Sequence, residues 1–484
     1  MSCSKCSPFA VPSSEFTPAE HPEFPSGSTN PCKLCTPLGA CLAFKGIAGT
    51  VPLLHGSQGC ATYIRRYLIS HFREPIDIAS TNFSEDSAVF GGRKNLHTAL
   101  DNVGRQYRPA LVGIATTCLS ETMGENMPML IGEYRGESRD LPTAAERPEL
   151  VHVSTPSFKG THAEGFHAAV RSLVGTLAGT AAPETRNPKP ETGKAPLALF
   201  PGMVSPADLR HLRDFCAAWG ETTITLVPDY AETLDGPSWA EFVRTPVGGT
   251  TVDELRALDR ATAALEFGHS LATAPATAGT HLNSRFSVPL HRLGLPIGVR
   301  ANDAFCAAME AATGREMPAR IAAERGRLID SYVDAHKYLA GKKAVVYGED
   351  DLVAGLAVFI AETGITPVLV ASGERNRRLA DAIHAAAPEL RGRIEVREGS
   401  DFGDIETRIE ELNPDLLLGS SKGYKLARSL NVPLVRCGFP VHDRLGAQRL
   451  QLLGYAGTQQ LFDRIVNALL EAKQEHSDIG YAYL

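Results

Sequence analysis

The sequence has no apolar run long enough to span a bilayer, and its N-terminus lacks the residue order of a signal peptide. It also lacks a basic run, and 48 Lys and Arg against 55 Asp and Glu give a net charge of −7. These absences argue against a membrane-spanning protein and against binding of nucleic acid or an anionic membrane surface. We therefore expect a protein of the cytoplasm.

Motifs for nucleotide binding are absent too. No GxxxxGK[ST] segment occurs, and no GxGxxG segment follows a strand-like run. Cysteine is sparse, with ten residues in a chain of 484, which is too few for a disulfide scaffold. The chain is therefore expected to bind no nucleotide itself and to keep its thiols reduced.

The composition is that of a globular protein, and the pattern indicates alternating strands and helices. Hydrophobic residues make up 43% of the chain and charged residues 21%. Strands are expected at residues 51–54, 110–117, 149–155, 197–203, 222–230, 414–421 and 432–438. Residues 342–373 have the strand, helix and strand order of a parallel βαβ unit. Further helices are expected at 206–220 and 457–476.

These runs predict an α/β fold of three doubly wound, Rossmann-like domains with parallel sheets. A Pro- and Thr-rich stretch at 182–196 indicates a linker. The expected division is an irregular N-terminal arm followed by three α/β domains, the last ending in a helix: 1–30, 31–190, 191–335 and 336–484. Ligands in such folds bind at the carboxyl ends of strands.

The cysteines are concentrated toward the N-terminus. Seven of the ten lie in the first quarter of the chain: Cys3, Cys6, Cys32, Cys35, Cys41, Cys60 and Cys118. Among these, Cys41 is on an apolar helix and is expected in the core. The later three have apolar neighbours and are expected to be buried and inert: Cys216, Cys306 and Cys437. Clustered reduced thiols indicate metal or redox chemistry near the N-terminal end.

Three of these thiols are expected to share one setting, the junction between a loop and the start of a helix at the end of a strand. Cys60 lies in HGSQGCATY, just after an apolar strand-like run. Cys35 precedes Thr36-Pro37, a plausible helix start, and Cys118 follows the strand-like ALVGIATT. Strand ends converge in an α/β domain, and the helix dipole favours a thiolate, the form that binds metals. The pattern favours an iron–sulfur cluster held by thiolates.

Three thiolates are one fewer than a four-iron cluster needs. Either another residue of this chain completes the ligand set, or a second chain does and the cluster lies at a subunit interface. A rival pattern pairs Cys3-x-x-Cys6 with Cys32-x-x-Cys35, as a four-cysteine zinc site would. Against zinc, the segment between the pairs lacks strand-like runs, and neither pair has the glycines of a zinc knuckle.

Longer motifs carry a resemblance to a known family. They are HFREP (71–75), SEDSAVFGG (84–92), ATTCLSE (115–121), STPSF (154–158), GFPVHDR (438–444) and LGYAGTQQL (453–461). In this order, and with Cys35, Cys60 and Cys118 at family-like spacing, they resemble the component 1 proteins of nitrogenase, specifically the β-type subunits. The resemblance covers nearly the whole chain after the N-terminal arm.

The resemblance implies a P-cluster, an [8Fe-7S] group shared between an α-like and a β-like subunit. Cys35, Cys60 and Cys118 match the β-side ligands, so the partner would supply the others. Ser157 matches a serine that ligates an iron of the oxidised cluster, with a helix or turn cap as the alternative. Tyr63 matches an aromatic residue near the path to the catalytic cofactor, with core packing as the alternative.

The resemblance also implies partners and a division of tasks. An ATP-dependent iron protein, a homodimer, would dock transiently and deliver electrons singly. The α-like partner of an α2β2 heterotetramer would hold a large catalytic iron–sulfur cofactor. Neither ATP nor substrate would then be bound by this chain, so no catalytic acid or base is expected in it.

Within the family, Cys35 and Cys118 favour a catalytic component, because similar chains of cofactor-maturation scaffolds generally lack matching cysteines. Residues 55–80, with CKLC upstream, are most similar to nitrogenase-like methylthio-alkane reductases, which cleave C–S bonds to methanethiol and a hydrocarbon. The early position of Cys35 also departs from the long N-terminal extension of molybdenum nitrogenase β-subunits. The alternatives are a vanadium- or iron-only nitrogenase β-subunit that reduces dinitrogen, a maturation scaffold, and a zinc-stabilised structural subunit.

Overall fold

A computed structural model of the chain describes residues 30–136, 147–180, 196–220, 222–241, 243–274 and 276–477. In this part of the chain, strands β1 to β13 form three sheets in which all paired strands are parallel. The expected α/β class with parallel sheets is confirmed.

In each sheet the strand that comes first in the chain lies in the interior, and later strands lie on both sides of it. The strand orders are β2-β1-β3-β4, β6-β5-β7-β8 and β11-β10-β9-β12-β13. The strands span Thr50–His55 (β1), Ala79–Ser80 (β2), Leu111–Thr116 (β3), Glu149–Val153 (β4), Leu197–Phe200 (β5), Ile224–Leu226 (β6), Ala264–Phe267 (β7), Leu290–Leu293 (β8), Lys343–Gly348 (β9), Thr366–Ser372 (β10), Glu395–Arg397 (β11), Leu416–Gly419 (β12) and Leu434–Arg436 (β13). We call the part built around each sheet the first, second and third unit.

Helices surround the sheets. The α-helices span Thr36–Lys45 (α1), Gln58–Phe72 (α2), Glu85–Phe90 (α3), Arg93–Tyr107 (α4), Cys118–Met123 (α5), Met127–Gly136 (α6), His162–Leu177 (α7), Pro206–Ala217 (α8), Val252–Arg256 (α9), Ala278–Phe286 (α10), Val299–Thr313 (α11), Ala319–Leu339 (α12), Asp350–Glu362 (α13), Leu379–Ala386 (α14), Phe402–Leu412 (α15), Tyr424–Leu430 (α16) and Gly454–Glu475 (α17). Short 3-10 helices span Ala257–Arg260 (η2), His269–Thr273 (η3), Pro388–Leu390 (η4), Ser421–Gly423 (η5) and Ala447–Arg449 (η6). None of the described helices is long and apolar enough to cross a membrane.

Both faces of the first sheet are covered, because successive strand residues point to opposite sides. Val51 and Leu53 of β1 pack with α4 and α6, whereas Leu54 faces the cluster that includes α1 and α7. The third sheet repeats this, with Val345 of β9 facing α15 and Val346 facing α13. Strands buried on both faces read as continuous apolar runs, which is why the sequence pattern located them.

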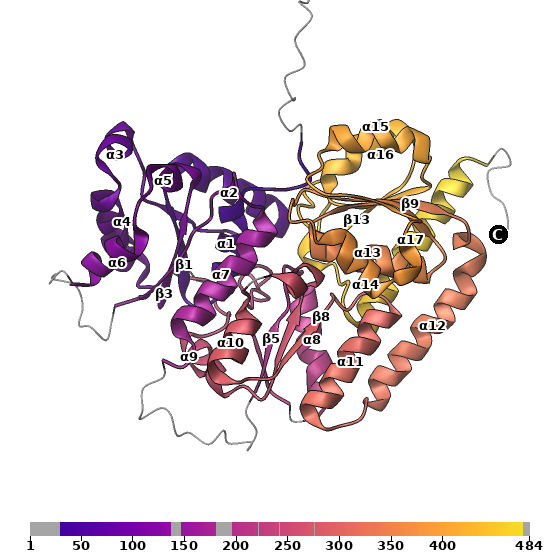
Figure 1. Ribbon diagram of the computed structural model, residues 1–484, viewed down its shortest axis with the longest axis horizontal. Helices are drawn as coiled ribbons and strands as arrows, with labels where there is room; N and C mark the ends of the chain where they lie inside the picture. Colours follow the sequence, from indigo (N-terminus) through magenta and orange to yellow (C-terminus); the bar gives the residue numbers. More distant parts are fainter. Residues whose placement is uncertain are drawn as a thin grey trace, which may run out of the picture.

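The three units share one core. Figure 1 shows the first unit at the left, the third at the right and the second below and between them. Phe72 at the end of α2 contacts rings from both other units, with centroids 6.4 Å from Tyr230 and 6.2 Å from Phe439. A single cluster of buried apolar side chains runs through all three units. The domain limits proposed from the sequence stay a prediction, and the limit between 335 and 336 lies inside α12.

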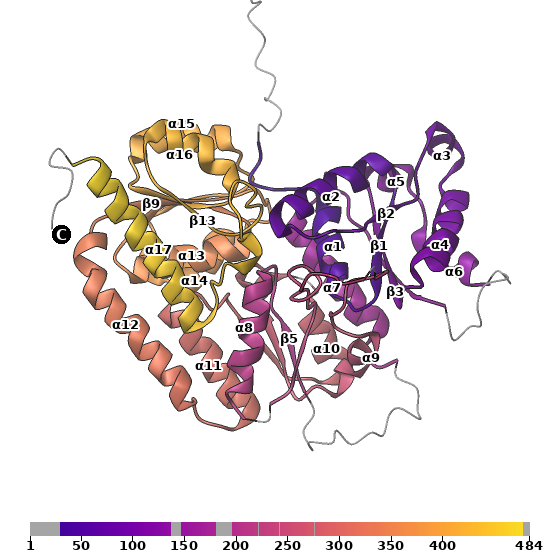
Figure 2. The same cartoon turned by 180° about the vertical axis from the view of Figure 1, so that it is seen from behind.

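Helix α1 packs against α7, and both helices are labelled in the view from behind in Figure 2. A Cβ atom at Gly39 would lie 1.7 Å from the backbone oxygen of His162, and one at Gly165 would lie 1.9 Å from that of Thr36. Only glycine permits backbones to approach this closely. The start of α1 is therefore held in place against α7.

Several parts of the sequence prediction fall outside the described residues. These parts are the N-terminal arm except Asn30, the linker except Pro196, and Cys3 and Cys6 of the rival zinc pattern. Helix α17 was predicted from residue 457 and begins three residues earlier, at Gly454.

Candidate metal centre

Exposure separates the cysteines into two groups. Among the described residues, three free cysteines are exposed: Cys35, Cys60 and Cys118. The others are buried: Cys32, Cys41, Cys216, Cys306 and Cys437. Burial raises the pKa of Cys32 and of Cys216 to about 12, so that these thiols stay neutral. The expected burial of Cys41 and of the three later cysteines is confirmed.

Cys60 lies in the first turn of α2, just beyond the end of β1. The chain leaves the sheet at His55 and enters the helix after Ser57. The Ser57 hydroxyl accepts a hydrogen bond from the backbone N–H of Gly59 at 3.3 Å. This cap satisfies an N–H group that the helix leaves free and fixes where the helix begins. The expected loop-to-helix position of Cys60 is confirmed.

The loop before Cys60 is tied to the start of α5, which begins at Cys118. The Thr117 hydroxyl donates to the backbone oxygen of His55 at 3.1 Å. A Cβ atom at Gly56 would lie 2.0 Å from the same hydroxyl oxygen, so only glycine fits there. Because β1 and β3 are neighbours in the sheet, Cys60 and Cys118 emerge at the same edge.

Cys35 reaches this edge by a route that the sequence analysis did not expect. It follows irregular backbone instead of a strand, and it is the N-cap residue of α1 with φ −60° and ψ 138°. The expectation that all three thiols end strands is wrong for Cys35. Its neighbour Leu34 is held by His162, whose Nδ1 accepts from the Leu34 N–H at 3.3 Å. The backbone oxygen of Leu34 accepts from the His162 N–H at 3.1 Å.

Ser157 lies beside Cys35. Its hydroxyl oxygen accepts a hydrogen bond from the backbone N–H of Thr36 at 3.2 Å. Ser157 therefore caps α1, which was the alternative to a ligand role, and its oxygen stands next to a thiol-bearing residue. Tyr63, on the turn of α2 that follows Cys60, is 65% exposed, so core packing is wrong for this side chain.

The three exposed thiols lie close enough to interact electrostatically. Burial raises the pKa of the Cys60 thiol, and the charges of Cys35 and Cys118 raise it further. The helix dipole by itself would lower this pKa, but in the protein chain alone desolvation and repulsion between thiolates outweigh the dipole. Bound cations would remove that repulsion, because metals bind the thiolate form.

The donor set fits a group of several irons better than a single ion. Among the described residues, no three His, Cys, Asp or Glu side chains are arranged to hold one metal ion. Cys35, Cys60 and Cys118 instead offer an incomplete set of sulfur donors at one surface. Iron–sulfur clusters are bound by cysteine thiolates. The residues present therefore fit such a cluster if a second chain completes its ligands.

Exposed apolar side chains stand beside the thiols. Leu119 directly follows Cys118 and is 38% exposed, and Phe158 directly follows Ser157 and is 59% exposed. Neighbouring exposed apolar residues are characteristic of surfaces that another chain covers. The thiol edge thus has the character of an interface.

Sequence reasoning missed two residues that shape this edge. The Glu125 carboxylate pairs with Nε2 of the buried His55 and accepts from the backbone N–H of Gly92, linking the end of β1 to the start of α4. Lys422 contacts the segment before Cys35 from the third unit. Both partners lie far along the chain from the residues they hold, and no local motif marks either one.

Comparison with known proteins gives the family. The chain matches the family described as Nitrogenase component 1 type Oxidoreductase over residues 35–470. The nitrogenase molybdenum-iron protein beta chain of Clostridium pasteurianum is 36% identical over 459 residues, covering 94% of this chain and 96% of that one. The corresponding chain of Azotobacter vinelandii is 32% identical, covering 93% and 86%. A solved structure described as Nitrogenase Cp1 at pH 6.5 matches with a TM-score of 0.87 at 33% identity, covering 96% of this chain and 98% of that one.

The chain belongs to the nitrogenase component 1 family, and within it to the β type. The resemblance found in the motifs is thereby confirmed at this level. A molybdenum-iron β chain is matched over 96% of its length, so the early position of Cys35 does not separate methylthio-alkane reductases from nitrogenases.

Proposed function

We propose that this chain is the electron-relay β subunit of a nitrogenase-type reductase. Cys35, Cys60 and Cys118 bind one side of an [8Fe-7S] P-cluster, and an α-type subunit binds the other. The observation that carries the proposal is the grouping of the only exposed thiols of the described residues at one apolar surface. Ser157, next to Cys35, ligates an iron of the oxidised cluster. Tyr63 stands beside the path to the partner's cofactor.

The assembly is an α2β2 heterotetramer, and the α subunit holds a large catalytic iron–sulfur cofactor. The incomplete ligand set supports a shared cluster, and the description of the relatives as beta chains supports an α-type partner. An ATP-dependent iron protein homodimer docks transiently and supplies the electrons.

The bound cluster supplies one-electron redox chemistry, and the residues of this chain have simpler tasks. The thiolates of Cys35, Cys60 and Cys118 bind iron, and the helix starts hold the sulfur atoms in place. Leu119 and Phe158 exclude water once the α subunit covers them. No proton donor for substrate is needed here, because substrate chemistry belongs to the α subunit.

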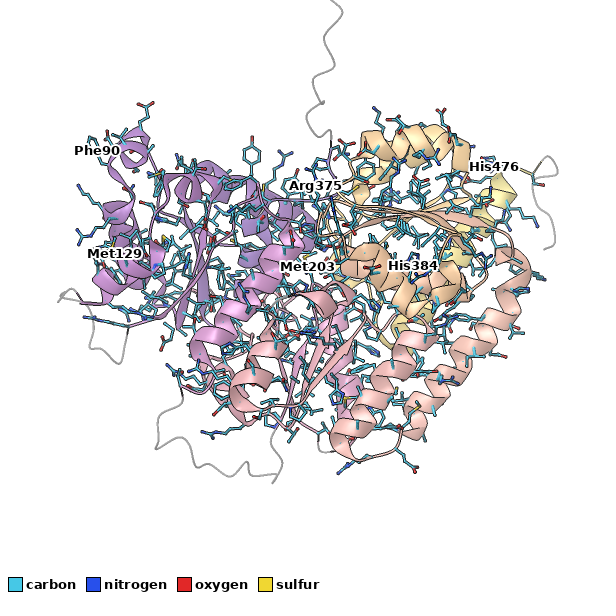
Figure 3. All side chains as sticks on the ribbon, in the orientation of Figure 1. Phe90, Met129, Met203, Arg375, His384 and His476 are labelled. Atoms are coloured by element: carbon cyan, nitrogen blue, oxygen red, sulfur yellow. The ribbon has the colours of Figure 1, made fainter. Side chains whose placement is uncertain are left out.

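Helix α3 is the surface on which the iron protein docks. Its last two residues are large and apolar, yet Val89 is 74% and Phe90 85% exposed, and Figure 3 shows Phe90 at the outer tip of the first unit. Helix α3 contacts α5, which begins at Cys118. A donor bound there lies near the thiol edge, as short-range electron transfer requires.

Iron analysis of a cysteine variant tests the cluster assignment. The chain is purified with its α-type partner as wild type, Cys60→Ala and Cys216→Ala. Cys60→Ala is expected to lose cluster iron and electron transfer, because an exposed ligand is gone. Cys216→Ala should keep both, because that thiol is buried away from the edge. Equal iron loss in the two variants would contradict the ligand assignment.

The iron count also separates the relay from a maturation scaffold. A P-cluster contributes about eight irons at each αβ interface, whereas a scaffold with a simple cluster contributes about four. An isolated chain that binds a complete eight-iron cluster would contradict the shared site. A chain that binds zinc in place of iron would support the structural-subunit alternative.

For the reaction in the α subunit, we propose reductive cleavage of methylthio-alkanes. Two electrons and two protons convert R–S–CH3 into R–H and CH3SH. The support is the likeness of residues 55–80, with CKLC upstream, to methylthio-alkane reductases. A relay subunit does not select substrate, so this support comes from family likeness and not from the geometry of the site.

Dinitrogen reduction is the second candidate, in a molybdenum, vanadium or iron-only nitrogenase. The nitrogenase beta chains that match nearly the whole length of this chain favour it. The purified complex with its iron protein, ATP and a reductant is supplied with a methylthio-alkane or with dinitrogen. Methanethiol with the matching hydrocarbon supports the first candidate. Ammonia formation, with the thioether left intact, supports the second and contradicts the first.

A further inference from the structure

The segment that leads to Cys35 belongs by its contacts to the third unit. Figure 1 shows this indigo segment running from the edge of the third unit to the first. The Cys32 N–H donates to the backbone oxygen of Ser400 at 3.2 Å, and Pro31 forms a β-bridge with Asp401. The Cys32 side chain is 7% exposed and belongs to the apolar cluster of Tyr347. The neutral, buried thiol of Cys32 acts as an apolar anchor for this segment.

Lys422 holds the same segment from above the third sheet. It lies in η5, directly after β12, and its Nζ donates to the backbone oxygen of Pro31 at 2.6 Å and to that of Lys33 at 3.2 Å. These two carbonyl groups flank Cys32, and the second is only two residues from Cys35. A single ammonium group thus clamps the backbone that positions one of the exposed thiols.

The Lys422 ammonium interacts electrostatically with the cysteines of this segment. The side chain is partly buried, and burial lowers its pKa. Among the described residues, the charges of Cys32 and Cys35 oppose this effect. Cys32 stays a neutral thiol, so of these two groups only Cys35, once it binds a metal as the thiolate, directs a negative charge at this ammonium. A charge in partly buried surroundings is screened less than one in water.

We propose that Lys422 positions Cys35 and raises the reduction potential of the cluster that Cys35 binds. The inference rests on the proposed P-cluster and adds a residue that tunes it from another unit of the same chain. A nearby positive charge stabilises the reduced cluster more than the oxidised one, because the reduced cluster is more negative. Net charge and hydrogen bonding are among the factors that set the potentials of iron–sulfur clusters.

Four variants of the complete complex separate charge from hydrogen bonding. Lys422→Met removes both, Lys422→Gln keeps a donor without charge, and Lys422→Arg keeps charge and donors. Lys425→Met removes a charge from an exposed position three residues along the chain. Each complex is analysed for iron, for the midpoint potential of the cluster in a redox titration followed by electron paramagnetic resonance, and for its thermal unfolding temperature.

The Met and Gln variants are expected to have more negative midpoint potentials than the wild type, with the Arg and Lys425 variants unchanged. Iron loss in the Met and Gln variants, with full iron in the Arg variant, equally supports a role for the Lys422 charge in holding Cys35. Full iron and a wild-type potential in the Met variant overturn the inference and leave the P-cluster proposal standing. A wild-type complex without cluster iron overturns the P-cluster proposal itself.

Discussion

At the scale of the residue, the Ser157 side chain beside Cys35 has two possible roles, a helix cap and an iron ligand. Ser157 accepts the backbone N–H of Thr36, so it stabilises the start of α1. The same oxygen lies beside Cys35, one of the proposed cluster ligands, and a deprotonated hydroxyl there could bind iron. The two roles have different consequences when the hydroxyl is removed, because a cap affects folding stability and a ligand affects one redox state of the cluster.

We predict that Ser157→Ala lowers the free energy of unfolding by about 1 kcal/mol, the usual cost of losing a helix cap. We also predict that it alters the spectrum of the oxidised cluster and leaves that of the reduced cluster unchanged. Thermal unfolding and electron paramagnetic resonance of the complex measure the two effects. Ser429→Ala, at an exposed position of α16, is the control. A stability loss without a spectral change would mean that Ser157 acts only as a cap.

At the scale of the element, helix α3 presents large apolar side chains to the surface, where another protein could bind them. It is six residues long, it has a capping box at Ser84, and acidic residues precede the exposed Val89 and Phe90. A short helix that exposes its largest apolar side chains gains little from the core of its own chain. An exposed apolar tip beside acidic residues is typical of a docking surface with a polar rim.

We predict that Phe90→Ala weakens docking of the iron protein. Truncating a central interface aromatic costs about 2 kcal/mol, or roughly a thirtyfold loss in affinity. The dependence of the electron-transfer rate on iron-protein concentration measures it, while iron content and cluster spectra stay those of the wild type. Val247→Ala removes an apolar side chain that is 78% exposed elsewhere and serves as the control. Equal effects of both substitutions would argue against a docking surface on α3.

At the scale of the whole molecule, a buried acidic cluster joins the three units. Asp351 at the start of α13 accepts the backbone N–H of Ser270 at 2.8 Å and pairs with Nε2 of His167 at 3.3 Å. These partners come from the second unit and from α7. Burial raises the pKa of the adjacent Asp350 to about 6, and it also raises the pKa of Glu374. Asp351 therefore stabilises the junction through its hydrogen bonds, whereas burial disfavours the charged forms of Asp350 and Glu374.

The sign of the pH effect follows from Asp350. Its pKa is higher in the folded chain than in the unfolded chain, so the folded state binds more protons between about pH 4 and pH 6. The free energy of unfolding therefore falls as the pH rises through this window. Removing the charge should relieve that penalty at neutral pH and have little effect below the window.

We predict that Asp350→Asn raises the free energy of unfolding by about 1 kcal/mol at pH 7.5, with the gain vanishing near pH 4. Calorimetric unfolding temperatures of the complex at the two pH values measure the change. Asp330→Asn, at an exposed position of α12, provides the comparison. A gain of the same size at both pH values would contradict the assigned pKa.

The sequence by itself determined the fold class, most strands of the three sheets, the burial of the later cysteines and the helix-start positions of Cys60 and Cys118. Local sequence patterns determine these features, because strands and helix starts are set by the spacing of apolar residues and by the residue types within a few positions. Strands β2, β7, β8 and β11 were missed, since they are short and β2, β8 and β11 are only partly buried.

The tertiary structure alone decided how Cys35 joins the other two thiols. No strand delivers it, and its place depends on contacts with His162 and Lys422, which follow it by more than a hundred residues. The exposure of Tyr63 and the clash that reserves position 56 for glycine were likewise invisible in the chain. Such contacts arise when separate units pack against one another, and no local period of residues encodes which distant surfaces meet.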